Sequence, residues 1–180
     1  MRTSGTIWGT LTVLGSGLWL LSEALERANG AIYPVSMAIL SAGLLVLAVA
    51  IWVLHAHQRR VAGWPSLVGA FGISLGCLCL ALVDLRGLHF GTIAEVNAHS
   101  PVLFNAGLIG VVVGTFAFGW SILRHRAFPA WTGVFVILST CISFAVEIAR
   151  LPDVGVTLAN VILNVALITM GWIVVRSTRA

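Results

Sequence analysis

Residues 31–54 read AIYPVSMAILSAGLLVLAVAIWVL, without a single charged side chain. The stretch is longer than the roughly 20 helical residues that cross the hydrocarbon core of a bilayer. Its apolar residues also do not alternate with polar ones, as the short strands of a transmembrane barrel would require. The stretch therefore predicts a transmembrane α-helix.

The same composition extends over the whole chain. Of its 180 residues, 59% are hydrophobic and 9% are charged, and the mean hydropathy is +1.03. A soluble domain needs charge over most of its surface, so most of this surface must face lipid. The sequence predicts an all-α, polytopic, six-helix transmembrane bundle of three antiparallel hairpins, because short connections make consecutive helices neighbours. The helices are expected at roughly 5–26, 31–55, 64–85, 101–124, 128–150 and 154–176, in a single transmembrane domain over residues 1–180 with no soluble domain.

The arginines indicate the orientation of this bundle. With the amino terminus inside, seven arginines fall in cytoplasmic segments and three in outer segments, which satisfies the positive-inside rule. The segment HAHQRR at 55–60 is interpreted as one of the cytoplasmic flanks, and all six acids fall on the outer side. The chain has no lysine and is rich in alanine, glycine and arginine, a composition that favours a GC-rich bacterial genome. We expect a multi-pass protein of the bacterial plasma (inner) membrane with both termini cytoplasmic.

Three acids stand at the outer ends of alternate helices, and each heads a stripe of small or polar residues. At ~1.5 Å per residue, all three acids lie near the outer hydrocarbon boundary. A polar stripe has no reason to face lipid, so these faces are predicted to look into the bundle. The helix at 31–55, with only two serines, is interpreted as mainly lipid-facing. The stripes are Thr12, Ser16 and Glu23; Ser74, Cys77, Ala81 and Asp84; and Thr132, Ser139, Ser143 and Glu147.

Arginines and amides complete the predicted site. Glu23 and Arg27, four residues apart, can pair within one helix, as can Glu147 and Arg150 at a spacing of three. Asp84 needs a partner from another helix, either Arg27 or Arg150. The amides on one face of the last helix either join helices or line a cavity. The ligand-binding or pore candidates are Glu23, Arg27, Asp84, Arg86, Asn105, Glu147, Arg150, Asn160 and Asn164.

The remaining residues argue against a catalytic or metal centre. Without lysine there can be no Schiff base, and no histidine lies deep enough in a helix for a bis-histidine haem. His89, Glu95 and His99 are only weak metal candidates, because their spacing matches no strong motif. The three cysteines are interpreted as buried small residues. We expect no catalytic residues, no cofactor and no nucleic-acid partner.

In size and helix count the chain resembles the membrane-embedded substrate-binding components of vitamin importers. This likeness implies a solute-binding role. Because the polar residues extend inward from the charged outer ends of the helices, we expect a solute-binding or transport protein with an outward-facing polar vestibule, whose partners are the lipid bilayer and a small polar ligand. The alternative is a non-catalytic subunit or assembly factor of a membrane complex, which would bind a membrane-protein partner or form a homo-oligomer. A membrane enzyme using His89 and His99 would lack a recognisable reactive core.

The orientation can be checked with a membrane-impermeant thiol reagent applied to intact cells. The asymmetry of the arginines predicts that the reagent labels Asn97→Cys and does not label Gln58→Cys. Labelling of the second variant from outside would invert the topology.

Overall fold

The computed structural model describes residues 2–29, 34–88, 100–149 and 154–179; within these ranges the side chains of 2–5, 29, 60, 147, 148, 178 and 179 are not described. The described residues form an all-α bundle of six helices, as the sequence predicts. The helices are α1 (Arg2–Asn29), α2 (Pro34–Gly87), α4 (Pro101–His125), α5 (Ala130–Ala149) and α6 (Val154–Arg179). Two of the six lie in α2.

Element α2 is a pair of antiparallel helices joined at a kink. The backbone leaves the helical region at Gly63, where φ is 58° and ψ is −152°, a conformation open to glycine because it has no Cβ. Pro65 follows two residues later, near the start of the second helix, where its missing N–H costs least. We call the residues of α2 before Gly63 its first half and the residues after Gly63 its second half. The loop expected at 56–63 is therefore mostly helix, and the turn is confined to a single residue.

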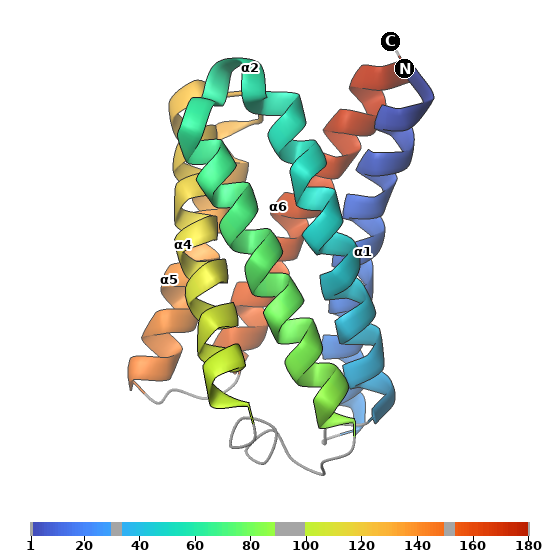
Figure 1. Ribbon diagram of the computed structural model, residues 1–180, viewed down its shortest axis with the longest axis vertical. Coiled ribbons are helices and arrows are strands. Elements are labelled where there is room, and N and C mark those ends of the chain that lie inside the picture. Colours follow the sequence, from blue (N-terminus) through green and yellow to red (C-terminus); the bar gives the residue numbers. More distant parts are fainter. Residues whose placement is uncertain (1, 30–33, 89–99, 150–153, 180) are drawn as a thin grey trace.

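The helices form a closed ring in which each contacts its neighbours in the chain (Figure 1). The order is α1, the first half of α2, its second half, α4, α5 and α6, and α6 returns to α1. Both termini lie at one end of the bundle, together with the kink of α2. We call this the terminal end, and the other, where α1 ends and α6 begins, the distal end.

Length and composition make this a membrane helical bundle. Both halves of α2, together with α4 and α6, are long and apolar enough to cross a bilayer, and α5 contributes a shorter apolar stretch, Ala130–Val146. Large apolar side chains also cover the outside of the ring, including Ile109 and Phe116 on α4 and Phe71 on α2. Such a surface is stable only against lipid or another apolar partner.

The first half of α2 contributes one of its faces to the hydrophobic core. Leu44, Leu47, Ile51 and Leu54 are buried there, and they belong to the same cluster as residues of α4, α5 and α6. Its two serines, Ser36 and Ser41, are buried as well. The interpretation of this helix as mainly lipid-facing was wrong, because a helix rich in leucine and valine gives no sign of which apolar face turns inward.

The polar stripes face the interior, as predicted. Thr12 and Ser16 on α1, Ser74 on α2, and Thr132 and Ser139 on α5 are all buried.

The three cysteines, all predicted to be buried, differ in their exposure. Cys77 and Cys79 are buried, but Cys141 is exposed on α5, so its interpretation as a buried residue was wrong. A cysteine is apolar enough to face lipid, and its position could not be inferred from residue type alone.

Glycines allow the second half of α2 to approach α4 closely. A Cβ added to Gly76 would lie 2.6 Å from the backbone nitrogen of Val111 and 2.7 Å from the carbonyl oxygen of Gly107. Backbone atoms cannot move aside as a flexible side chain can. Small residues at a helix contact are a common way to join helices in lipid, where apolar burial gives no driving force.

We predict that Gly76→Ala destabilises the bundle and that Gly17→Ala does not. The first change forces α2 and α4 apart and should cost about 1–3 kcal/mol. The matched change at Gly17 meets no atom within 4 Å and should be neutral or slightly stabilising, because alanine favours the helix. Thermal unfolding of both variants in detergent measures the difference, and equal melting temperatures would contradict the close contact.

Candidate functional site

The most extensive polar network of described residues joins α1 to α6 at the distal end. The Glu23 carboxylate on α1 accepts a hydrogen bond from the Thr157 hydroxyl at 3.1 Å and a second from the Asn160 side-chain amide, both on α6. The side chains of Glu23 and Asn160 are only partly buried. The network thus closes the ring between the first and the last helix, at an end of the bundle where solvent or lipid headgroups can reach it.

Thr157 also connects the carboxylate to a guanidinium. Arg27 donates to the Thr157 hydroxyl oxygen from both Nε, at 3.1 Å, and Nη2. A hydroxyl can accept from one group while it donates to another, so Thr157 links the two charges. Glu23 and Arg27 were expected to pair within their own helix. In the described part of the chain, their connection runs instead through a residue of α6.

A second group of acids lies beside this network, between α1 and α2. Ser36 on the first half of α2 donates to Glu26 at 3.2 Å, and Ser22 donates to the Ser36 backbone carbonyl at 2.8 Å. The Asp84 carboxyl group, on the second half of α2, lies near Glu26. Like charges at such a position favour a cation nearby.

The contacts between α1 and α6 fix the register of this helix pair. At the distal end Glu23 meets Thr157. Fourteen residues along each helix, Gly9 meets Gly171, since a Cβ added to Gly9 would lie 2.6 Å from the Gly171 carbonyl oxygen. Residues that repeat every seven positions stay on one face of a helix. The residues halfway between these two contacts must therefore face each other as well.

Ser16 and Asn164 occupy those halfway positions. Both side chains are fully buried. The Asn164 amide nitrogen donates to the Asn160 backbone carbonyl at 2.9 Å, which leaves the side-chain oxygen Oδ1. Within the described residues, neither this Oδ1 nor the Ser16 hydroxyl has a hydrogen-bond partner. Buried polar groups without hydrogen-bond partners are costly in an apolar interior. A further polar group at this depth between α1 and α6 would therefore stabilise the contact.

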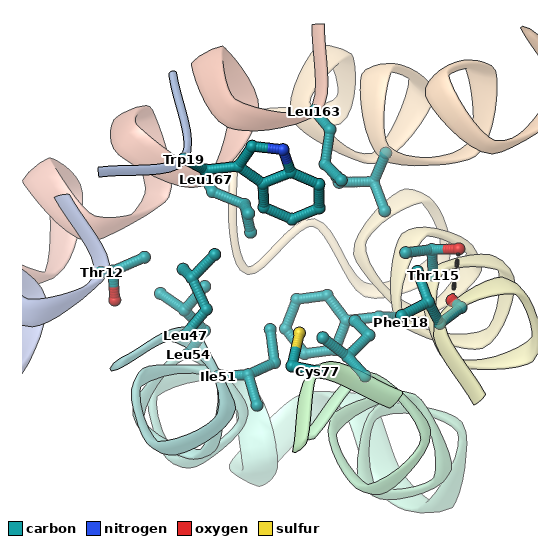
Figure 2. Close-up of a pocket in the computed structure, with 13 residues that line it drawn as sticks. Thr12, Trp19, Leu47, Ile51, Leu54, Cys77, Thr115, Phe118, Leu163 and Leu167 are labelled. Carbon is teal, nitrogen blue, oxygen red and sulfur yellow. Dashed lines mark hydrogen bonds between the residues drawn. The ribbon is translucent and has the colours of Figure 1, made fainter. Parts of the chain in front are cut away.

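The centre of the bundle is apolar (Figure 2). A cavity of about 20 Å³ lies inside the ring, with Trp19 and Leu163 on one side and Ile51 and Cys77 on the other. A cavity needs about 10–15 Å³ to hold one water. The hydroxyl of Thr115, which also lines the cavity, already hydrogen bonds to the Val111 carbonyl at 2.8 Å. This space is too small and too apolar to hold a polar solute.

Comparisons of the chain with protein-family models, with curated proteins and with solved structures find no match. The candidate site therefore rests on its own geometry.

The predicted candidates separate into three groups. Glu23, Arg27 and Asn160 meet in one network, with Asn164 below it. Asp84 lies beside Glu26, Arg86 donates to the Ser100 hydroxyl at 3.2 Å, and Asn105 is exposed on α4. The remaining candidates lie outside the described residues: the side chain of Glu147, then Arg150, and the weak metal candidates His89, Glu95 and His99. In the part of the chain that is described, no group of three or more His, Cys, Asp or Glu residues could hold a metal ion.

The central residue of the network, Thr157, was not among the candidates. Its signal was present in the sequence, because it lies three residues before Asn160 and seven before Asn164, on the same face of α6. A threonine in an apolar helix commonly bonds to its own backbone, as Thr169 does to the Val165 carbonyl. Residue type alone could not distinguish these two roles.

We predict that Thr157→Val destabilises the protein more than Thr169→Val. The first change removes the hydroxyl that links Glu23 to Arg27 and should cost about 1–2 kcal/mol. The second removes a bond within α6 only. Melting temperatures in detergent measure both. If Thr169→Val lowers the melting temperature as much as Thr157→Val does, the hydrogen bonds between α1 and α6 contribute nothing specific to stability.

Proposed function

We propose that this protein is a membrane-embedded binding component that takes a small, positively charged solute at the distal end of the bundle. The observation that carries the proposal is the Glu23 carboxylate, held between Thr157 and Asn160 at the head of the α1–α6 contact. The distribution of arginines supports an outward-facing distal end. The positive charge of the solute follows from the acids gathered there.

The charge balance of the distal end favours a cation. Three carboxylates, those of Glu23, Glu26 and Asp84, come from α1 and α2. The Arg27 guanidinium is directed to Thr157, and Arg86 bonds to Ser100 at the start of α4. An ammonium or guanidinium group could share the Glu23 carboxylate and reduce the repulsion between Glu26 and Asp84.

The interior supports a binding role over transport by this chain alone. Below the network, the central cavity of about 20 Å³ has an apolar lining and has no room for a solute. Transfer across the membrane would require the helices to separate. A binding component that releases its solute with the help of a partner protein needs no such pathway within its own resting bundle.

A second candidate function is that of a subunit in a membrane complex. Asn105 supports it, because its side chain is exposed on a face of α4 that is otherwise covered by apolar residues such as Val102 and Ile109. A polar side chain on such a face is best stabilised by a helix of another protein or of a second copy. The two candidate functions depend on different residues. Solute binding depends on Glu23, and assembly of a complex depends on Asn105.

Binding can be tested by thermal shift with a panel of small ammonium and guanidinium compounds. Each cation is compared with an uncharged alcohol of similar size. A cation that binds the folded state raises the melting temperature as its concentration rises. The shift should be lost in Glu23→Gln and retained in Asn105→Leu. The proposal fails if no cation stabilises the unmodified protein, or if Glu23→Gln responds as the unmodified protein does.

A further inference from the structure

A second polar cluster lies at the terminal end, around the kink of α2. The Ser66 hydroxyl, just after the kink, accepts a hydrogen bond from the Gln58 amide nitrogen at 2.6 Å and lies 2.8 Å from Nδ1 of His55. Gln58 and Ser66 are both fully buried.

The burial of Gln58 also affects the labelling test of orientation, for which Gln58 was expected in a cytoplasmic flank. A buried cysteine at this position would escape the thiol reagent on either side of the membrane, so failure to label it from outside would not report the topology. Ser177, exposed at the same end, is the better position for that test.

Ser121 on α4 lies level with this cluster. A Cβ added to Gly69 would lie 2.6 Å from the backbone nitrogen of Phe118, which fixes the register of α4 against the second half of α2. Three residues further toward the terminal end on each helix are Ser66 and Ser121. Residues three apart lie on nearly the same face of a helix, so Ser121 is directed toward Ser66 and its partners.

Two polar atoms of the cluster have no hydrogen-bond partner among the described residues. They are the side-chain oxygen Oε1 of Gln58 and the hydroxyl oxygen of Ser121, and both residues are fully buried. Leaving such groups unpaired is costly where neither water nor lipid can bond to them. A further polar group between α2 and α4 would pair both atoms.

The chemistry of the cluster identifies that group. The Gln58 oxygen can only accept a hydrogen bond, so the missing group must be a donor, which excludes a simple anion. The terminal end also carries the exposed guanidinium groups of Arg59, Arg124 and Arg126, which disfavour a cation. A small neutral donor remains, and water is the one that is always available.

We propose that an ordered water binds between Gln58 and Ser121. The water donates a hydrogen bond to the Gln58 side-chain oxygen and forms a second hydrogen bond with the Ser121 hydroxyl. It thereby links α2 to α4. Buried waters typically make about three hydrogen bonds to polar groups that would otherwise be unpaired. The site is independent of the solute site at the distal end.

A double-mutant cycle tests this bridge. Gln58→Met and Ser121→Ala each remove one partner, and each should lower the melting temperature in detergent. The decrease in melting temperature of the double variant should be clearly smaller than the sum of the two single decreases, because either change alone already disrupts the binding of the water. Additive shifts would overturn the proposal.

The matched control replaces a buried serine outside the cluster. Ser139 on α5 bonds to the Val136 carbonyl of its own helix at 2.8 Å. Ser139→Ala combined with Gln58→Met should give additive shifts, and coupling as strong as that of Ser121→Ala would overturn the proposal.

An experimental structure of the unmodified protein, at a resolution that reveals ordered water, provides a measurement that does not depend on the variants folding. Density for a water within hydrogen-bond distance of both Gln58 Oε1 and Ser121 Oγ is the expected result. A direct contact between the two side chains, or an empty gap between them, would show that no water bridges α2 and α4.

Discussion

A polar side chain inside a bilayer has no solvent to bond with, and this constraint organises the whole bundle. Each polar residue must find a partner in its own helix, reach a partner on a neighbouring helix, or lie at an end of the bundle. Thr157 and Asn160 satisfy it by reaching Glu23, while Thr169 bonds to its own backbone. The hydrogen bonds between helices thus lie along the contacts that hold the ring together.

The two ends of the bundle meet this constraint differently. At the distal end, the charges of Glu23 and Arg27 are bridged by a neutral hydroxyl and remain partly accessible. At the terminal end, Gln58 and Ser66 are neutral and fully buried. Between them lies an apolar core around Phe118 and Leu54. The chain therefore has a polar cluster at each end, and the core between them, which is apolar apart from isolated residues such as Ser16 and Asn164, opposes the passage of ions.

The sequence predicts the helices and the inward stripes well, because both depend on local properties. An uncharged stretch such as 31–54 must be a helix in lipid, and Thr12 and Ser16 must turn away from lipid. The partners of the stripes are harder to predict, because they depend on the register between helices far apart in the chain. Nothing near Glu23 in the sequence indicates Thr157. In the same way, the arginines beside Gln58 suggest a solvent-facing segment, yet the single-residue turn at Gly63 brings Gln58 back against Ser66.

The closure of the ring between α1 and α6 has a consequence for biogenesis. Thr157 follows Glu23 by 134 residues and Asn160 follows it by 137, so both are synthesised well after α1 has left the ribosome. Until α6 is inserted, the Glu23 carboxylate on α1 lacks the two hydrogen-bond donors that it meets on α6. Water or lipid headgroups at the distal end must supply the hydrogen bonds of this carboxylate until then.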